Sequence, residues 1–259
     1  MSHTYLSDIP PFALYQNLYF IGSSRVSVHL IDTAEGLVMI DTGFPDMTEQ
    51  ILDSMEALGF DPKDIRAIFH SHGHYDHFGC TVRFKELSGA TTYISRIDNE
   101  LVNGKIPMTL ERYPLPRFDC DVLVEDGDVF SFGDVTVRCL LTPGHTDGVL
   151  SFLITLKNGE ETVVAAMHGG IGRNTLRAEF LNKHGLSFAC RELFRAGLHR
   201  LAVERVDLVL GNHPQQSDTA GKRERVLRGE SVLDTTEWQR FLLHTEQKLD
   251  EMIENEAQA

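Results

Sequence analysis

The chain lacks the cysteine spacings that mark disulfide frameworks and structural zinc sites. Its four cysteines, Cys80, Cys120, Cys139 and Cys190, are scattered and form no CxxC pattern. Such usage fits free, buried thiols in a reducing compartment better than a set of disulfides. The N-terminal residues also lack a basic start followed by an apolar run, so we expect no secretory signal. The sequence therefore predicts a cytoplasmic protein.

Positive charge and long apolar runs are also scarce. The 24 lysines and arginines are outnumbered by 38 aspartates and glutamates, which gives a formal net charge of −14. This charge repels phosphate backbones and anionic lipid surfaces, and no cluster of basic residues is large enough to form a compensating face. No apolar stretch is long enough to span a bilayer. Nucleic acids and membranes are therefore not expected as partners.

The remaining composition is that of a globular protein, since 259 residues with a hydrophobic fraction of 42% can bury a substantial core. Strands are expected at residues 18–21, 26–31, 37–40, 65–69, 122–124, 135–141, 150–156, 162–166 and 206–210, and helices at 47–58, 79–87, 188–201 and 235–255. Two β-rich halves, each followed by helices, predict an α/β protein: an αββα sandwich of two mixed β-sheets with outer helices. No linker divides the chain, so we expect a single domain over residues 1–259.

Two segments between these elements are expected to be irregular. Residues 71–77 are polar and connect a predicted strand to a predicted helix, a position where layered α/β folds collect reactive groups. Residues 103–118 contain three prolines and no periodicity. We expect the second segment to form a loop that walls a pocket.

The first of these segments is unusually rich in histidine. Counted from residue 70 to residue 77, it holds four histidines and one aspartate in eight positions. A solvated loop does not need imidazoles at alternate positions, whereas neutral imidazole is the commonest metal ligand in proteins. Gly73 lets the backbone turn so that His72 and His74 can face one ion. Asp76 and His77 can then face a neighbouring ion.

Two residues at predicted strand ends are expected to support the loop rather than to bind metal. His70 ends the strand before the loop and lies outside the alternating spacing, which favours a structural histidine. Asp41 ends an earlier strand. We expect it to stabilise a turn or to orient a metal ligand.

The HxHxDH pattern of residues 72–77 resembles the signature of the metallo-β-lactamase superfamily. The segment around Asp41-Thr42-Gly43 precedes this pattern, and those around Pro143-Gly144-His145 and Asn212-His213-Pro214 follow it, which is the order found in the family. Within the superfamily the sequence is most similar to class B β-lactamases of the third subclass. That likeness runs nearly end to end, from Pro11-Phe12 to a C-terminal helix that reads Glu246-Gln247-Lys248-Leu249-Asp250-Glu251.

The resemblance implies two zinc ions per chain and assigns ligands to each. The first ion would be bound by His72, His74 and His145, and the second by Asp76, His77 and His213. Three protein ligands for each ion leave a position for solvent, as catalytic zinc sites require.

The function implied by the resemblance is zinc-dependent hydrolysis. A metal-activated hydroxide would cleave the carbonyl bond of a β-lactam or related cyclic amide, with a small molecule as substrate. Asp76 is the candidate catalytic residue, since it could orient the nucleophile and shuttle a proton. The sequence carries no pattern that indicates an oligomeric state.

One position departs from the common family pattern. Many superfamily members have an aspartate or cysteine at the strand end after the Pro-Gly-His loop, and the third β-lactamase subclass has a serine, whereas this chain has His168. This imidazole could be an extra ligand, a contact to substrate or a structural group. Gly169, Gly170 and Gly172 beside it suggest either a close backbone approach to metal or substrate or a plain turn.

Other readings of the same motif remain open. Lactone or thioester hydrolysis would use the same metals, although such enzymes of the superfamily usually carry the aspartate that His168 replaces. A non-catalytic, metal-binding member is a further alternative, which the six filled ligand positions disfavour. The di-iron redox branch is disfavoured because it usually has glutamate where His74 stands and carries a flavin domain. The nucleic-acid-processing branches are disfavoured as well, because they insert a further domain for which this sequence shows no segment.

Overall fold

The computed structural model describes residues 9–108, 115–159 and 161–258. Within these residues the strands form two sheets. The first has seven strands in sequence order: β1 (Phe12–Tyr15), β2 (Leu18–Phe20), β3 (His29–Thr33), β4 (Gly36–Ile40), β5 (Ile65–Phe69), β6 (Thr91–Ser95) and β7 (Val122–Val124). The second has five, in the order β12 (Leu208–Gly211), β11 (Glu161–His168), β10 (Leu150–Asn158), β9 (Val135–Leu141) and β8 (Val129–Phe132).

Both sheets are mixed, as the sequence predicts. In the first sheet β1 to β4 pair antiparallel, whereas β4 to β7 pair parallel. In the second sheet β8 to β11 pair antiparallel, and β11 pairs parallel with β12. The parallel pairs bring the carboxyl ends of their strands to one edge, where connecting loops can meet.

Helices of varied length follow or connect the strands. They are α1 (Thr48–Ala57), α2 (Tyr75–Phe78), α3 (Thr81–Ser88), α4 (Arg96–Val102), α5 (Ala178–His184), α6 (Ala189–Leu201), α7 (Thr219–Leu227) and α8 (Glu237–Ala257), with short 3₁₀ turns η1 (Pro62–Asp64), η2 (Asn174–Leu176) and η3 (Pro214–Gln216). Among the described residues, no helix combines the length and apolarity that crossing a bilayer would need.

Alternation along the strands explains the layers. In β4, Val38 and Ile40 lie in the core between the two sheets, whereas Leu37 and Met39 lie in the core under the first sheet's helices. Successive side chains of a strand point to opposite faces. Because both faces of β4 are apolar, this strand is buried on both sides, which a sandwich with outer helices requires.

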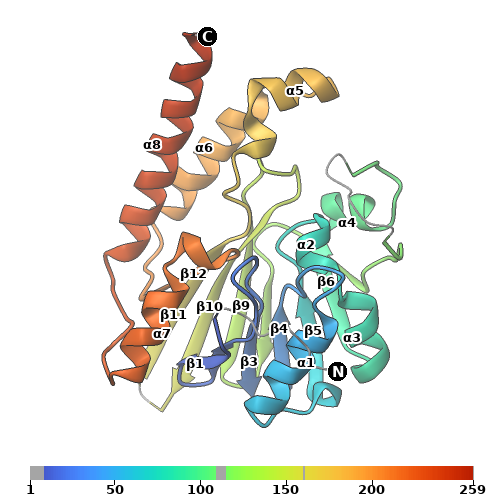
Figure 1. Cartoon of the computed structure of the whole chain (residues 1–259), viewed down its shortest axis with the longest axis vertical. Helices are drawn as coiled ribbons and strands as arrows, with labels where there is room; N and C mark the ends of the chain where they lie inside the picture. The colour runs from blue at the N-terminus through green and yellow to red at the C-terminus, as the bar shows by residue number, and fades with distance from the viewer. Residues whose placement is uncertain (1–8, 109–114, 160, 259) are drawn as a thin grey trace.

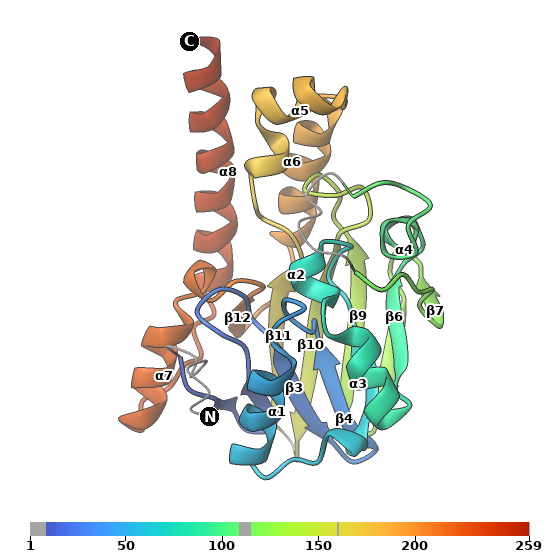
Figure 2. The same cartoon turned by 45° about the vertical axis from the view of Figure 1, so that its right-hand side comes forward.

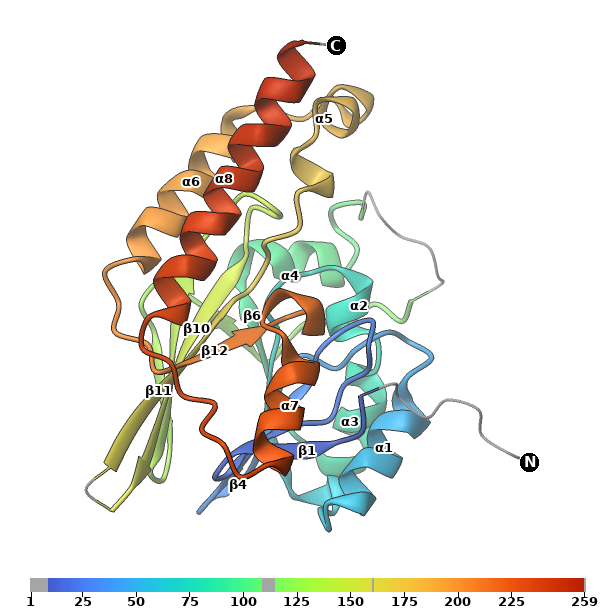
Figure 3. The same cartoon turned by 60° about the vertical axis from the view of Figure 1, so that its left-hand side comes forward.

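The outer helices cover each sheet from its own side. On the outer face of the first sheet, Ile51 and Met55 of α1 and Phe84 of α3 lie buried in one core. The face of the second sheet buries Phe194 of α6 with Trp238 of α8. Figures 1 and 3 show α6 and α8 running side by side outside the second sheet, while α1 and α3 lie beyond the first. The αββα prediction is confirmed.

Several sequence predictions need correction in detail. Residues 71–77 are not all loop, because the last of them enter α2, and the helix predicted at 79–87 begins at Thr81 and ends at Ser88. The strand predicted at 206–210 is β12, two residues later at its start, and the one predicted at 26–31 begins at His29. Strands β1, β6 and β8 and helices α4, α5 and α7 were not predicted. The strands among them have four or five residues, and the helices bury at most one apolar side chain each, Val102 in α4 and Leu181 in α5, so they show little periodicity.

Candidate metal centre and active site

The candidate site lies at the carboxyl ends of strands from both sheets. Asp41 follows β4, the histidine-rich segment follows β5, His145 follows β9, and His213 follows β12. Figure 2 shows the loops after these strands meeting near α2, at the end of the sandwich from which α4 and α5 also rise. Loop residues at this edge are held by a rigid scaffold and still reach solvent, as active-site residues usually do.

Three of the predicted ligands converge on one point. The Nε2 atom of His72 lies 3.1 Å from Nδ1 of His74, and that Nδ1 lies 3.0 Å from Nε2 of His145. Nitrogen atoms that share one tetrahedral zinc ion at ordinary bond lengths are about 3.3 Å apart. The three imidazoles therefore have the spacing of a metal-binding group, and their ligand atoms lie within 4.8 Å of one another.

The far nitrogen of His145 fixes which of its atoms can bind a cation. Its Nδ1 lies 2.7 Å from the Gly172 carbonyl and 3.0 Å from Oγ1 of Thr175. A carbonyl oxygen only accepts, so Nδ1 carries the proton. The Nε2 lone pair is therefore free to face the other two histidines. Nδ1 of His72 lies 3.1 Å from Oγ of Ser71, and because that hydroxyl donates its proton to Asp41, it accepts from Nδ1 and leaves Nε2 of His72 free as well.

The second group consists of Asp76, His77 and His213, whose ligand atoms also lie within 4.8 Å of one another. Oδ2 of Asp76 is 3.7 Å from Nε2 of His77 and 3.8 Å from Nε2 of His213. The Nδ1 atom of His213 donates to the Arg25 carbonyl at 2.7 Å. The Nε2 atoms of the two imidazoles thus face the same carboxylate oxygen. The ring centroids of His72 and His77 lie 4.2 Å apart, with the rings tilted by 43°, so the two groups are neighbours.

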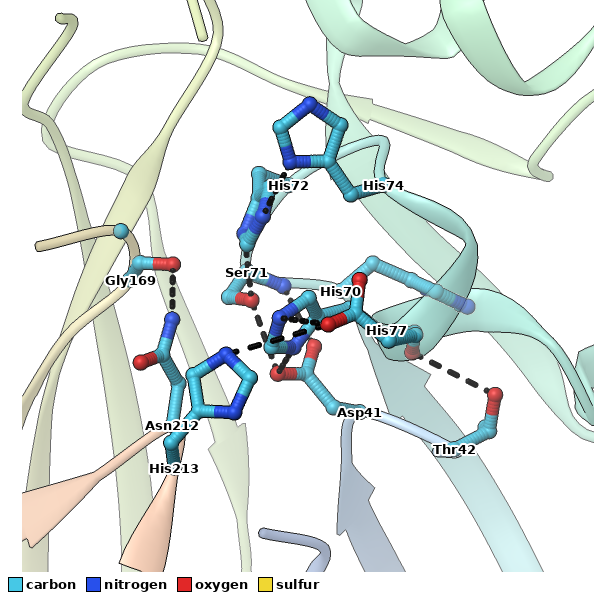
Figure 4. Close-up of polar contacts among 12 residues, drawn as sticks. Asp41, Thr42, His70, Ser71, His72, His74, His77, Gly169, Asn212 and His213 are labelled. Atoms are coloured by element: carbon cyan, nitrogen blue, oxygen red, sulfur yellow. Dashed lines mark hydrogen bonds and ion pairs between the residues drawn. The ribbon is translucent and has the colours of Figure 1, made fainter. Parts of the chain in front are cut away.

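Asp41 holds the second group and the motif loop together. Its Oδ2 accepts from Nδ1 of His77 and from Oγ of Ser71, each at 2.8 Å, and its Oδ1 accepts from the Ser71 backbone N–H at 2.7 Å. Figure 4 shows these contacts around the Asp41 carboxylate. Asp41 has a φ of +59°, a left-handed conformation that costs an aspartate energy. The predicted supporting role of Asp41 agrees with these contacts.

Burial keeps most of these imidazoles neutral, which is the form that binds metal. It lowers the pKa of His145 to about 4, and it lowers the pKa of His72 and His74 well below 6.5 with help from neighbouring imidazoles. For His77, burial also lowers the pKa, but the carboxylates of Asp76 and Asp41 outweigh it and raise the pKa above 6.5. The site thus concentrates its negative charge around His77.

A buried carboxylate outside the motif links two of the ligand-bearing loops. Oδ2 of Asp98, in α4, accepts from the Gly73 backbone N–H at 2.7 Å and from Oγ1 of Thr146 at 2.6 Å. Gly73 and Thr146 are each adjacent to a predicted ligand. Sequence reasoning missed Asp98, although Ser95 three residues before it forms the N-cap of α4 and accepts from the Asp98 N–H at 3.1 Å.

The glycine of the motif serves packing rather than an unusual backbone turn. A Cβ atom at Gly73 would lie 2.9 Å from Cβ of Leu101 and 3.0 Å from the Asp98 carbonyl oxygen, so the loop is pressed against α4. Gly172, near the predicted site, would place a Cβ 2.9 Å from Cε1 of His145. Both glycines allow a close approach, and Gly172 does so beside a predicted ligand.

His168 and His70 lie outside both ligand groups. Nδ1 of His168 accepts from the Gly170 N–H at 3.2 Å, and burial lowers its pKa to about 3. Its ring centroid lies 5.7 Å from that of Phe194 in α6. His70 bonds the Tyr93 carbonyl at 3.0 Å and Oγ1 of Thr81 at 2.7 Å. His70 is therefore a structural histidine, as the sequence predicts, and His168 is in neither of the groups that can hold an ion.

Asn212, beside His213, links the carboxyl ends of the two parallel strands of the second sheet, β11 and β12. Its Nδ2 donates to the Gly169 carbonyl at 2.6 Å, as Figure 4 shows. This bond fixes the loop after β11 to the loop after β12. The position of His213 thus depends on the second sheet, while His77 depends on the first.

Comparisons with known proteins agree with this geometry. The chain is 32% identical over 122 residues to the N-acyl homoserine lactonase AttM of Agrobacterium fabrum, which covers 44% of this chain and 45% of the relative. The chain thus spans about half the length of such curated relatives. Among solved structures, the subclass B3 metallo-beta-lactamase BJP-1 of Bradyrhizobium japonicum superposes with a TM-score of 0.85 at 25% identity, covering 98% of this chain and 97% of that one.

A metallo-beta-lactamase of Cronobacter sakazakii superposes equally well, with a TM-score of 0.85 at 28% identity over 96% of this chain and 98% of that one. The sequence model of the metallo-beta-lactamase superfamily matches residues 21–158, just over half of the chain, and this span includes β4, the histidine-rich segment and His145. The fold, the matched segment and the convergence of the motif side chains agree, and the chain belongs to the metallo-beta-lactamase superfamily.

Proposed function

We propose that this protein is a dinuclear zinc hydrolase that cleaves the carbonyl bond of a β-lactam or a related cyclic amide. The observation that carries the proposal is the pair of three-residue groups, His72 with His74 and His145, and Asp76 with His77 and His213. Imidazole and carboxylate are the ligands of catalytic zinc, and three protein ligands for each ion leave a position open.

The hydrogen bonds of the imidazoles give a physical reason why this donor set fits zinc. In His145 and His213, Nδ1 donates to a carbonyl oxygen, which leaves the Nε2 lone pair of the neutral ring free. In His77, Nδ1 donates to Asp41, so that Nε2 is the atom that faces Asp76. Partners of this kind orient a metal-bound imidazole and raise its basicity. Nδ1 of His74 faces Nε2 of both His72 and His145, and a proton on it could serve one of these acceptors, whereas a cation would serve all three nitrogen atoms.

Zinc bound here would lower the pKa of a water molecule towards about 7 and polarise a substrate carbonyl. The protein's own residues would orient that chemistry. The Asp76 carboxylate would orient the attacking water and could relay a proton to the leaving group, and the pKa of this carboxyl is lowered because His77, His213 and His74 outweigh its burial. Asp41 would hold His77 in place during the reaction.

Lactone hydrolysis is a second candidate, because the AttM proteins matched by this chain bear the name N-acyl homoserine lactonase. A lactone carbonyl is attacked by the same nucleophile as a strained amide. The two candidates share the site and differ in the leaving group, which is an alkoxide for the lactone and an amine for the lactam.

Metal analysis of the purified protein, combined with turnover of a chromogenic cephalosporin and of a lactone before and after chelation, tests the proposal. We expect two zinc equivalents per chain, loss of turnover on chelation, and recovery on adding zinc. A fully zinc-loaded protein inert towards β-lactams, lactones, thioesters and esters would refute hydrolysis and favour a metal-binding role.

We also propose a cytoplasmic location, on the basis of the cysteines. Cys80, Cys120, Cys139 and Cys190 are all free thiols, and burial raises the pKa of each of them. Fractionation of cells that express the tagged chain tests this: recovery in the periplasmic or extracellular fraction would contradict it.

A further inference from the structure

Helix α8 extends from one loop of the candidate site to another. It is 21 residues long, from Glu237 to Ala257, and packs against α6 outside the second sheet. A helix rises about 1.5 Å per residue, so the two ends of α8 are about 30 Å apart. Figure 3 shows it running from the level of β12 to that of α5. A glutamate near each end of α8 binds a different loop of the site.

At the start of α8, Glu237 binds a buried lysine. Oε1 of Glu237 accepts from Nζ of Lys222 at 2.7 Å, and the Lys222 side chain is 1% exposed. The same ammonium donates to the carbonyls of Val209 and Ser217, each at 2.8 Å. These two carbonyls lie on either side of His213 in the chain. An ammonium has three donors, so Lys222 uses all of them to connect the His213 loop to α8.

Near the end of α8, Glu256 binds the segment between β11 and α5. Its Oε1 accepts from the Ala178 backbone N–H at 2.8 Å, and its Oε2 accepts from the guanidinium of Arg191 in α6. The Arg191 side chain is 10% exposed, and its Nε donates to the Leu176 carbonyl at 2.8 Å. Glu256 and Arg191 thus hold both Leu176 and Ala178, at the end of η2 and the start of α5.

The segment that Glu256 holds is also the one that orients His145. Oγ1 of Thr175, next to Leu176, donates to the His145 carbonyl at 2.9 Å and lies 3.0 Å from Nδ1 of the same histidine. The Gly172 carbonyl accepts from that Nδ1 at 2.7 Å. A shift of residues 172–176 would therefore displace both oxygen atoms that orient this imidazole.

We propose that α8 holds His145 and His213 at their positions, with Glu256 and Glu237 as the positioning residues. This rests on the proposed metal sites and deepens them, because each end of the helix supports one ligand group. Neither glutamate belongs to a ligand group itself. Removing one partner of a buried ion pair leaves the other uncompensated, so the loss of either glutamate should loosen its own loop. Metal sites need supports of this kind on rigid elements.

The middle of α8 offers a matched control. Oε1 of Glu246 accepts from Arg195 at 2.9 Å and from His199 at 2.8 Å, and both of these partners lie in α6. The Glu246 side chain is 20% exposed, as is that of Glu237, and that of Glu256 is 25% exposed. Within the described residues, the hydrogen bonds of the Glu246 side chain join α8 to α6 alone. Glu246→Ala therefore removes a comparable ion pair from the same helix without touching a ligand-bearing loop.

Zinc affinity measured at each group tests the proposal. His213→Ala leaves the first ligand group complete, and His145→Ala leaves the second complete. In the His213→Ala background, Glu256→Ala should weaken zinc binding about three- to tenfold and Glu237→Ala less than about twofold, below the effect of a direct partner of a ligand. In the His145→Ala background we expect the reverse. Competition with a chromogenic chelator measures these affinities.

The reversal between backgrounds distinguishes positioning from a general loss of stability, which would weaken both groups alike. Glu256→Gln keeps an oxygen acceptor and should recover part of the affinity that Glu256→Ala loses. Where an alanine variant does not fold, the glutamine variant is measured in its place. Glu246→Ala should leave both affinities within about twofold of the parent. Equal effects of the Glu256 and Glu237 variants in both backgrounds, or an effect of Glu246→Ala as large as theirs, would overturn the proposal.

Hydrogen–deuterium exchange of the full chain, with and without zinc, separates a failure of α8 from a failure of the metal sites. Glu256→Ala should speed exchange at Ala178 at least about fivefold, because this amide loses a charged acceptor, and should leave residues 209–217 as in the parent. Glu237→Ala should speed exchange in residues 209–217 instead. A parent that binds no zinc would refute the metal sites, while exchange still decides whether α8 holds the loops. Unchanged exchange in both segments would refute the role of α8.

Discussion

Replacing Asp98 by alanine should weaken both the fold and one of the two metal sites. The substitution removes the acceptor of the Gly73 N–H and of Thr146 Oγ1, at 2.7 and 2.6 Å, and both donors belong to loops that carry predicted ligands. A hydrogen bond to a charged group contributes about 1.5–3 kcal/mol, so the two together contribute about 3–6 kcal/mol. Burial of Asp98, which raises its pKa to about 6, offsets part of this.

We therefore expect Asp98→Ala to lower the free energy of unfolding by about 2–4 kcal/mol. For a chain of this size, that corresponds to a fall in Tm of about 5–15 °C, measurable by circular dichroism. Zinc affinity at the group of His72, His74 and His145 should fall about 10- to 100-fold, because residues that orient metal ligands have effects of this size. Competition with a chromogenic chelator measures each affinity.

Two control variants make the result specific. Asp98→Asn keeps an acceptor oxygen and the side-chain shape, so it should lose less stability and less zinc affinity than Asp98→Ala. Asp119→Ala removes a carboxylate that binds Asn99 and Asn103 near the same helix but touches neither ligand loop, and it should leave zinc affinity unchanged. If Asp98→Ala melts within about 1 °C of the parent and binds both ions as tightly, the link between loops is unimportant.

The remaining predictions concern pH, the second ion and the second sheet. The folded state holds a proton on Asp98 up to about pH 6, whereas the unfolded chain releases it near pH 4. The free energy of unfolding of the parent, relative to that of Asp98→Asn, should therefore fall as pH rises from about 4 to 6 and stay level above that. Urea titrations at several pH values measure both free energies, and a parent that gains stability over Asp98→Asn in this range would contradict the prediction. His213→Ala should retain about one zinc equivalent by mass spectrometry of metals and lose at least about 100-fold in kcat, and retention of both ions would disprove its role as a ligand. Asp41→Asn should weaken zinc binding about 10-fold or more, since His77 loses a charged partner, and unchanged binding would show that the Asp41 contact does not matter. Lys222→Met should lower Tm by about 5–15 °C, because Nζ of Lys222 donates to the Val209 and Ser217 carbonyls and to Glu237, and adding Glu237→Gln should recover part of the loss.

The sequence alone determined much of the architecture, because long periodic elements carry their own signal. Strand β4, with apolar residues on both faces, and helix α1, with Ile51 and Met55 on one face, were predicted close to their observed bounds. The short strand β1 and the brief helix α4 were missed. Their positions depend on packing against neighbours, which no local pattern records.

The same division holds for the site. The alternating histidines of residues 70–77 are adjacent in the chain, so their spacing alone predicted metal binding. His145 and His213 became candidates through resemblance, because a lone histidine after a strand has no distinctive pattern of its own.

Only the tertiary structure decided what surrounds those ligands. The Gly172 and Arg25 carbonyls that set the imidazole tautomers have no side-chain signature, and Asp98 is one acidic residue among 38 until the fold brings it beneath Gly73. The predicted wall of a pocket likewise requires two distant segments to meet: residues 106–108 line a cleft beside His145 together with residues of the α5–α6 segment, and residues 109–114 lie outside the described part of the chain. Hydrogen bonds and cavities form between residues far apart in the chain, so they depend on how the two sheets and their loops come together.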